Sequence, residues 1–456
     1  MSNFFSRNRD RVHYFECREF APIHFSSDSR SMSSSFQRLS FMTAFKLITL
    51  RSSWFLCLAS LLLLVESVTA QKIDEMPALP QPADFRADGG LEITSVDPKT
   101  FDMFGATMRM VERGDDRNLL VGHSRGVWEL TRDESGHWRP VSEIKPPESC
   151  ANPGTFGVSF EASGEHVALR PVVLGEKARI HVYRQSEAGW DHVQDISPAM
   201  LPEGRRFGMK VTVFDDWLCV YGRDGVTVFK KNDAGLFFLS EVIDSEGESK
   251  AEKERFGKSV VISGDQMFVS SFRAPRLNER VDVYELTPES KWKHVQVLDP
   301  PHRKFGTWFG HVMDVCGDSM VISSPRWKDM AGRVDVYERG PKGLWTHVQD
   351  LDVFPDSLSS FGTTLSLEGG NLVVGASVPN VPGSAYLYEM DSSAGRFNRV
   401  SMLGLVGKEH ISSGFAGATL MTGGQCFISA PGSTQGAFPK SGCVYAYDLQ
   451  SASPSE

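Results

Sequence analysis

Cysteine, basic charge and long apolar runs are all scarce in this chain of 456 residues. It has 7 cysteines and no Cys-x-x-Cys pair, which excludes a disulfide-built scaffold and a zinc ribbon. Its 48 Lys and Arg against 57 Asp and Glu give a net charge of −9, whereas a nucleic-acid-binding protein needs a basic surface. The 41 glycines follow no three-residue period, and no long stretch keeps a 3.6-residue apolar spacing. Collagen-like and coiled-coil proteins are therefore excluded as well.

The first residues have the composition of targeting sequence and not of a domain. Residues 1–41 are polar and rich in serine, so they cannot bury a core. We expect them to form a disordered extension that is absent from the mature protein or precedes a true start at Met42.

The longest apolar run, Trp54 to Val65, follows the positive charge of Lys46 and precedes small residues that end at Ala70. A membrane-spanning helix needs about 20 apolar residues, so this shorter run indicates a signal peptide over 42–70 with cleavage near Ala70. Residues 71–90 then form a linker. The mature chain is expected to be secreted or to reach the periplasm or cell envelope, without a stable membrane span.

A Phe-Gly pair recurs along the rest of the chain at spacings of 49 to 54 residues, which is close to the length of a propeller blade. Six copies are intact and a seventh is degenerate. They begin at Phe104, Phe156, Phe207, Phe256, Phe309, Phe361 and Phe415.

Each repeat holds four short strand signals. In the fourth repeat an alternating run, Ser259 to Ile262, is followed by the turn Gly264-Asp265 and the apolar run Met267 to Val269. A second alternating run, Val281 to Tyr284, and a run that begins with an aromatic residue, Trp292 to Gln296, complete it. Period-two alternation and glycine turns are typical of β-strands. Seven such repeats predict an all-β, seven-bladed β-propeller with four-stranded blades.

The two ends of the repeat region indicate how the ring closes. The seventh repeat stops after its third strand, at Tyr447, and an unmatched strand, Leu91 to Val96, precedes the first Phe-Gly. We expect this N-terminal strand to complete the last blade and so to remove two open sheet edges. The propeller would then span 91–449, followed by a tail at 450–456. The repeated Phe should pack between blades, where the adjacent Gly lets backbones approach closely.

Two segments, Phe256-Gly257-Lys258-Ser259-Val260 and Leu372 to Ser377, carry a resemblance to the FG-GAP repeats of the integrin α-subunit β-propeller superfamily. The resemblance implies a propeller and, because leg domains are missing, a stand-alone exported member of that superfamily. Calcium loops of the Asp-x-Asp-x-Asp-Gly kind are missing too, since the equivalent turn is only Gly264-Asp265. No metal and no cofactor are therefore expected.

Two short motifs match known functional patterns only by spelling. Gly122 to Gly126 has the Gly-x-Ser-x-Gly pattern of a nucleophile elbow, but that motif needs a strand-to-helix turn, and here it falls between two strands. Arg113-Gly114-Asp115 spells an adhesion tripeptide, yet its Gly-Asp is the first repeat's copy of a structural turn. No catalytic residue is assigned.

Histidine and cysteine could form sites only through neighbouring strands. His192, His294 and His347 recur in Trp-x-His-Val-Gln, on fourth strands of different blades, so they are interpreted as structural and too far apart to share a metal. Cys426 and Cys443 lie in neighbouring strands, and a disulfide between them is possible.

Basic and aromatic residues gather in variable connections on one face of the predicted ring, where binding residues usually lie. We expect this face to bind an extracellular protein or an anionic or carbohydrate polymer, with arginine making bidentate contacts and the tryptophans serving as stacking platforms. The alternatives are a solvated rim, a polysaccharide hydrolase or lyase with a site in the central channel, and a scaffold in an envelope assembly. The candidate ligand-binding residues are Arg273, Arg276, Trp308, Arg326, Trp327 and Lys328.

Overall fold

The computed structural model divides the chain into two compact units, Met1–Pro77 and Ala78–Glu456, and describes residues of the second only. The expected extension, signal peptide and tail, and all but one residue of the linker, lie outside the described residues. In the described part of the chain no helix is long and apolar enough to cross a membrane. The description covers 90–449 except 115, 204, 223–224, 245–255, 273–278, 303–305, 353–358, 378–382 and 405–413.

The described residues form seven four-stranded antiparallel sheets, which confirms the predicted all-β, seven-bladed propeller. We number the sheets as blades 1 to 7. Blades 1 to 3 consist of β2 (Met108–Arg113), β3 (Asp116–His123), β4 (Gly126–Arg132), β5 (Trp138–Ile144); β6 (Phe160–Ser163), β7 (His166–Leu169), β8 (Ile180–Ser186), β9 (Gly189–Ile196); and β10 (Lys210–Phe214), β11 (Trp217–Tyr221), β12 (Val226–Lys231), β13 (Phe237–Ile243).

Blades 4 to 7 follow the same order, and only the last takes a strand from the other end of the chain. They consist of β14 (Phe256–Ser263), β15 (Gln266–Phe272), β16 (Glu279–Leu286), β17 (Trp292–Leu298); β18 (Met313–Cys316), β19 (Ser319–Ser323), β20 (Val334–Arg339), β21 (Trp345–Leu351); β22 (Phe361–Glu368), β23 (Asn371–Ala376), β24 (Ser384–Asp391), β25 (Arg396–Gly404); and β26 (Thr419–Thr422), β27 (Gln425–Ala430), β28 (Cys443–Asp448), β1 (Leu91–Thr94).

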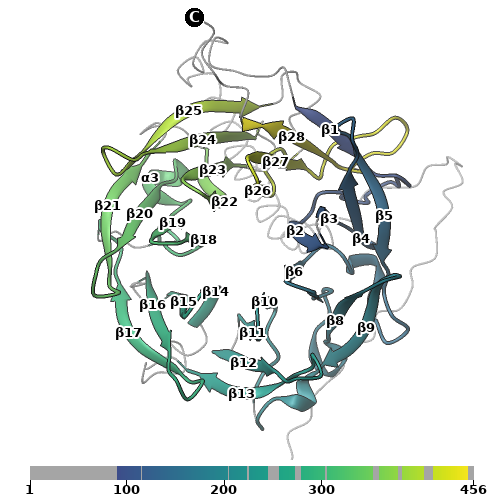
Figure 1. Ribbon diagram of the computed structural model, residues 1–456, viewed down its shortest axis with the longest axis horizontal. Helices are drawn as coiled ribbons and strands as arrows, with labels where there is room; N and C mark the ends of the chain where they lie inside the picture. Colours follow the sequence, from purple (N-terminus) through teal and green to yellow (C-terminus); the bar gives the residue numbers. More distant parts are fainter. Residues whose placement is uncertain are drawn as a thin grey trace, which may run out of the picture. The chain divides into compact units, whose positions relative to one another are not determined.

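The blades form a closed ring (Figure 1). The innermost strand of each blade contacts that of the next, from β2 through β6, β10, β14, β18 and β22 to β26, which contacts β2 again. Within blade 7, β1 pairs antiparallel with β28, so that Leu91 lies opposite Ala446 and Thr94 opposite Cys443. The predicted closure by the N-terminal strand is therefore confirmed.

The repeated phenylalanines lie between blades, as expected. All seven are at most 8% exposed. Phe309 packs with Val281 of blade 4 and Met313 of blade 5 in one cluster. The adjacent Gly310 has φ +80°, and a Cβ there would come within 2.5 Å of Ser270 in blade 4. Only glycine allows both this conformation and this approach without strain.

Glutamine in the Trp-x-His-Val-Gln motif joins the outer strands of adjacent blades. The Gln296 side chain donates to the carbonyl oxygen of Trp345 (2.7 Å) and accepts from the Trp345 amide (2.8 Å). The same two-way contact joins Gln194 to Phe237 and Gln349 to Phe397. Each glutamine thus satisfies a backbone donor and acceptor at the start of the next fourth strand.

Deleting residues 86–98 should lower the melting temperature sharply, because it removes β1 and the buried Ile93 and leaves β28 with an open edge. Circular dichroism measures the change. Ile93→Asp should act in the same direction, whereas Thr94→Ala, at an exposed position of the same strand, should have little effect. An unchanged melting temperature in the deletion would contradict closure by β1.

Candidate functional site

The described residues of the predicted binding set lie on the face that carries the connections between second and third strands and between blades, which we call the loop face. The structure describes Trp308, Arg326, Trp327 and Lys328 of this set, and Arg273 and Arg276 lie outside the described residues. Trp308 and Arg326 are brought together: the Arg326 guanidinium carbon lies 3.7 Å from the centroid of the Trp308 ring. This distance is that of a stacked cation–π pair.

A buried carboxylate positions the segment that carries Trp308. Glu279, at the start of β16, accepts hydrogen bonds from the Thr307 hydroxyl (2.6 Å) and from the amides of Trp308 (2.9 Å) and Phe309 (3.1 Å). The Arg326 amide in turn donates to the carbonyl oxygen of Thr307 (3.0 Å). The two connections that hold the stacked pair are thus fixed to each other.

Arg326 precedes a turn of left-handed backbone, α3 (Trp327–Met330). Lys328, Asp329 and Met330 have φ of 46°, 55° and 75°, and each left-handed residue other than glycine costs about 1–2 kcal/mol. The turn is held from outside, because the Ser360 amide donates to the carbonyl oxygen of Met330 (2.7 Å). Backbone strain of this kind is typical of functional loops.

Trp327 is buried, so the expectation that it forms an open stacking platform is wrong. Its side chain is only 6% exposed. The ring of His302 lies 5.4 Å from its ring, and the Arg333 guanidinium lies 5.2 Å above it. Trp327 therefore anchors the left-handed turn. Lys328 is exposed, as expected, and lies 4.0 Å from the Asp352 carboxylate.

His311 and Lys210 complete a group of side chains around Trp308, and neither was singled out from the sequence. The ring of His311 lies 5.3 Å from that of Trp308. Burial, followed by the charges of Lys210 and Arg326, lowers the pKa of His311 to about 4. Lys210 and Arg326 therefore act on this imidazole through their charge, and the imidazole is neutral at pH 7. We call Lys210, Trp308, His311 and Arg326 the channel-mouth cluster.

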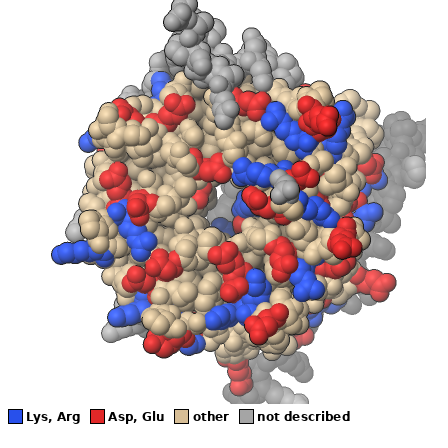
Figure 2. Space-filling model, in the orientation of Figure 1, with Lys and Arg blue, Asp and Glu red and all other residues tan. Residues whose placement is uncertain are grey.

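The channel-mouth cluster is rich in positive charge. Lys210 begins β10, the innermost strand of blade 3, and donates to the carbonyl oxygen of Lys258 at 3.0 Å on the innermost strand of blade 4. Among the described residues, no carboxylate oxygen lies within 4.0 Å of the charged nitrogens of Lys210 or Arg326. Figure 2 shows one face of the ring, hollowed at its centre and bordered by charged side chains.

Carboxylates on the innermost strands are already bonded between blades. Glu161 of blade 2 receives the guanidinium of Arg109 of blade 1, with Nε at 2.8 Å. Asp314 of blade 5 accepts the amides of Val315 and of Leu367 in blade 6, both at 2.8 Å. Burial raises the pKa of Asp314 to about 6. These two acids therefore join neighbouring blades.

The raised pKa of Asp314 predicts a loss of stability with rising pH. Its carboxyl ionises near pH 4 in the unfolded chain but only near pH 6 in the folded one. Between these two pH values the unfolded state is therefore stabilised relative to the folded state, and the free energy of unfolding falls. Relative to Asp314→Asn, the wild-type free energy of unfolding should fall by about 2 kcal/mol from pH 4 to 6.5, as measured by urea unfolding. Asp318→Asn, exposed in the next turn, is the matched control. A difference that does not change with pH would contradict the assignment.

The Gly-x-Ser-x-Gly motif does not build a catalytic triad. The Ser124 hydroxyl donates to Asp102 (2.8 Å), and Nδ1 of His123 lies 3.2 Å from the same oxygen. Arg125 binds both oxygens of this carboxylate at 3.1 Å. Burial raises the pKa of Asp102, but hydrogen bonds from His123, Arg125 and Ser124 outweigh burial and hold this pKa far below its usual range. Serine and histidine thus share the aspartate and are not bonded to each other.

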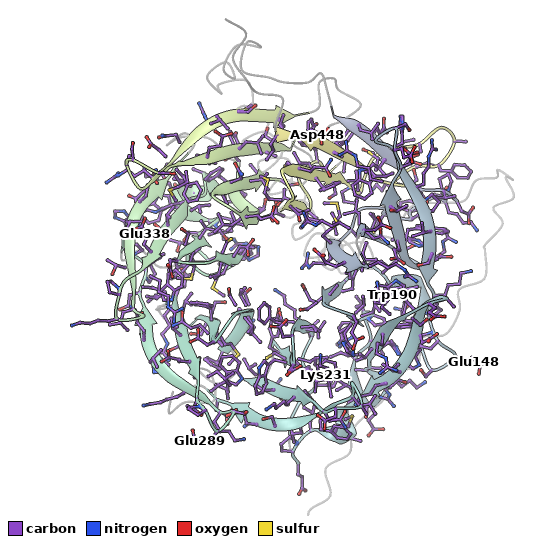
Figure 3. All side chains as sticks on the ribbon, viewed as in Figure 1. Glu148, Trp190, Lys231, Glu289, Glu338 and Asp448 are labelled. Atoms are coloured by element: carbon purple, nitrogen blue, oxygen red, sulfur yellow. The ribbon has the colours of Figure 1, made fainter. Side chains whose placement is uncertain are left out.

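Arg113 of the adhesion tripeptide serves the contact between blades 1 and 2. Its guanidinium lies 3.3 Å from the Glu129 carboxylate and donates to the carbonyl oxygen of Ser186 (2.7 Å). Trp190, labelled in Figure 3, donates to Glu129 as well (3.0 Å). Asp115 lies outside the described residues. The Arg113 side chain therefore forms contacts within the propeller, whereas the arginine of an adhesion loop projects into solvent.

Cys426 and Cys443 lie on the paired strands β27 and β28, as expected, but both are unbonded thiols. Cys426 lies opposite Tyr447 and Cys443 opposite Ala430. This offset of four residues separates them by about 13 Å along the strand. A disulfide needs Cα atoms within about 7 Å, so the possible disulfide is wrong.

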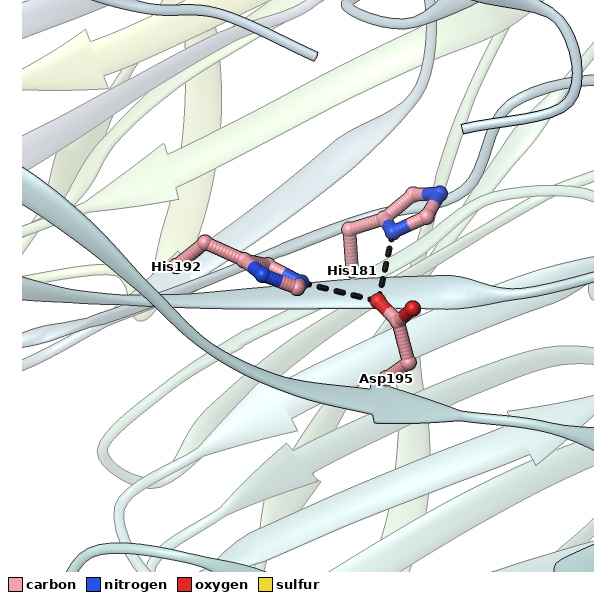
Figure 4. A group of neighbouring side chains, drawn as sticks. All are labelled: His181, His192 and Asp195. Atoms are coloured by element: carbon pink, nitrogen blue, oxygen red, sulfur yellow. Dashed lines mark hydrogen bonds and ion pairs between the residues drawn. The ribbon is translucent and has the colours of Figure 1, made fainter. Parts of the chain in front are cut away.

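Blade 2 contains a cluster of two histidines and one aspartate (Figure 4). His181 on β8 and Asp195 on β9 are opposite each other in the sheet, with Nδ1 and Oδ1 2.7 Å apart. Nε2 of His192 lies 2.8 Å from the same oxygen. Burial lowers the pKa of His181, and Asp195 partly offsets this. The repeat spacing relates His192 only to histidines of other blades, so it does not reveal these partners on the paired strands of the same blade.

Comparisons with known proteins add no family assignment. No family model matches the chain, that of the FG-GAP repeat included, and no curated protein matches its sequence. A Lactobacillus plantarum protein is similar in structure, at 11% identity and a TM-score of 0.49, over 72% of this chain and 90% of that one. A putative 6-phosphogluconolactonase from Bacteroides fragilis is also similar in structure, at 12% identity and a TM-score of 0.49, over 76% of this chain and 89% of that one.

A periplasmic gluconolactonase from Pseudomonas aeruginosa is similar at 17% identity and a TM-score of 0.47, over 73% of this chain and 96% of that one. At these identities and TM-scores, none of the similarities supports an inference about what this chain binds or does.

Proposed function

We propose that this protein is an exported propeller of the FG-GAP type that acts as a binding or adhesion module for an anionic partner at the cell surface or in the envelope. The channel-mouth cluster is the observation that carries this proposal. Arg326 stacks on Trp308, whose ring lies beside that of His311, and no described carboxylate lies within ion-pair distance of Arg326 or Lys210. Positive groups held together in this way attract an anionic ligand.

The stacked pair gives this site its chemical preference. The Trp308 ring and the fixed connection behind it orient the Arg326 guanidinium, whose planar fork matches a carboxylate or a sulfate. His311 is neutral near pH 7 and can add a hydrogen bond without further repulsion between cations. An acidic polysaccharide, with one anionic group per sugar, is the partner that we favour.

The bonded acids of the innermost strands favour binding over hydrolysis. A glycoside hydrolase of the common kind uses two carboxyl groups that face the sugar. Glu161 is held by Arg109, and both oxygens of Asp314 accept backbone amides. Neither acid is left to transfer a proton or to activate water.

Replacing Arg326 or Lys210 with alanine should weaken binding of heparin or polygalacturonate about tenfold or more, because each change removes one charged contact. Surface plasmon resonance with the immobilised polymer measures the change at low and physiological salt. Arg339→Ala is the matched control, since Arg339 ends β20 on the opposite face, close to Asp265. Binding that is equal in Arg326→Ala and wild type, or no binding of either polymer, would contradict the proposal.

A further inference from the structure

Three blades repeat one arrangement of side chains between their third and fourth strands. In blade 4, Asp282 on β16 lies near His294 on β17, with Oδ1 and Nε2 3.2 Å apart. Blade 5 repeats this with Asp335 and His347. In both blades the aspartate is buried, so it needs a positive partner to offset its charge.

An arginine two residues before the aspartate supplies that charge. Nε of Arg280 donates to Asp282 at 2.8 Å, and Nε of Arg333 donates to Asp335 at 2.6 Å. Arg333 also binds Asp350, the fourth-strand carboxylate of blade 5. In both blades a guanidinium cation therefore offsets the charge of the buried aspartate.

Blade 2 has a similar group of side chains, but among the described residues its arginine forms no hydrogen bond with the group and acts on His181 only through its charge. His181 stands where the buried aspartate stands in the other two blades, and Asp195 matches Asp350 in the register of blade 5. Arg179, at the position of Arg333, donates instead to the backbone carbonyl oxygens of Glu176 (2.5 Å) and Ala178 (2.8 Å). In this described part of blade 2, two imidazoles and one carboxylate thus lack the arginine hydrogen bond that the equivalent groups have.

We propose that His181, His192 and Asp195 bind a divalent transition-metal ion of the zinc kind. One ring nitrogen of His181, one of His192 and a carboxylate oxygen of Asp195 all lie within 4.8 Å of one another. Zinc holds imidazole nitrogen and carboxylate oxygen at about 2.0–2.2 Å, which places neighbouring ligand atoms about 3–4 Å apart. Small rotations of these side chains are enough to exchange the shared hydrogen bonds for metal bonds.

The donor atoms decide the class of metal. Imidazole nitrogen suits zinc and its neighbours, whereas calcium and magnesium take sets of oxygen ligands. The site is open to an ion, since the side chains of His192 and Asp195 are 30% and 25% exposed. The three protein ligands leave one tetrahedral position for water or a small anion.

Titration of the purified protein with Zn²⁺ in a calorimeter tests the proposal. We expect one ion per chain, and binding at least tenfold weaker in His192→Gln and in Asp195→Asn. His347→Gln is the matched control, because it removes the equivalent histidine from the blade that holds Arg333, and it should leave zinc binding unchanged. Circular dichroism shows whether each variant is folded.

X-ray absorption of the zinc-loaded wild-type protein tests the ligands without any substitution. We expect two imidazole ligands and oxygen, and no sulfur. The proposal would be overturned by the absence of saturable binding, by sulfur ligands, or by folded His192 and Asp195 variants that bind zinc as the wild type does. Polymer binding at the channel-mouth cluster involves none of these residues, so failure of either proposal leaves the other standing.

Discussion

The insertion of one phenylalanine per repeat between neighbouring blades is the interaction on which the rest of the structure depends. Each of the seven rings is buried, and burial of a phenylalanine stabilises the fold by about 1.5–3 kcal/mol. A glycine after the ring lets the next strand begin against the previous blade, as at Gly310. Because every blade supplies one side of two such contacts, no blade can complete its core alone.

This packing leaves other positions of the repeat free to vary, and both proposed sites lie at such positions. The rings and the glutamine contacts fix the inner and outer strands of adjacent blades, so the connections between them need not contribute to the core. At blade 5 such a connection holds a strained left-handed turn and presents Arg326 against Trp308. At blade 2 a variation within the repeat replaces an aspartate–arginine pair with a histidine. Both sites are departures from a repeated scaffold.

The sequence was sufficient for the fold, because a 49- to 54-residue repeat and an unmatched strand specify both the blades and their closure. It was less informative about side chains. Spacing alone does not show whether a loop residue is buried, so it does not distinguish the buried Trp327 from an open stacking platform. The spacing of residues along the chain also does not give the register of paired strands. In the observed register Cys426 and Cys443 are four residues apart, whereas His181 lies opposite Asp195. These contacts depend on which residues lie opposite each other.

Differential scanning calorimetry tests most directly the claim that shared phenylalanine contacts make the seven blades one cooperative unit. The account predicts a single transition in which the calorimetric enthalpy equals the van't Hoff enthalpy, because no blade keeps a complete core once its neighbour unfolds. A calorimetric enthalpy well above the van't Hoff value, or separate transitions for parts of the ring, would show that blades unfold independently and would contradict it.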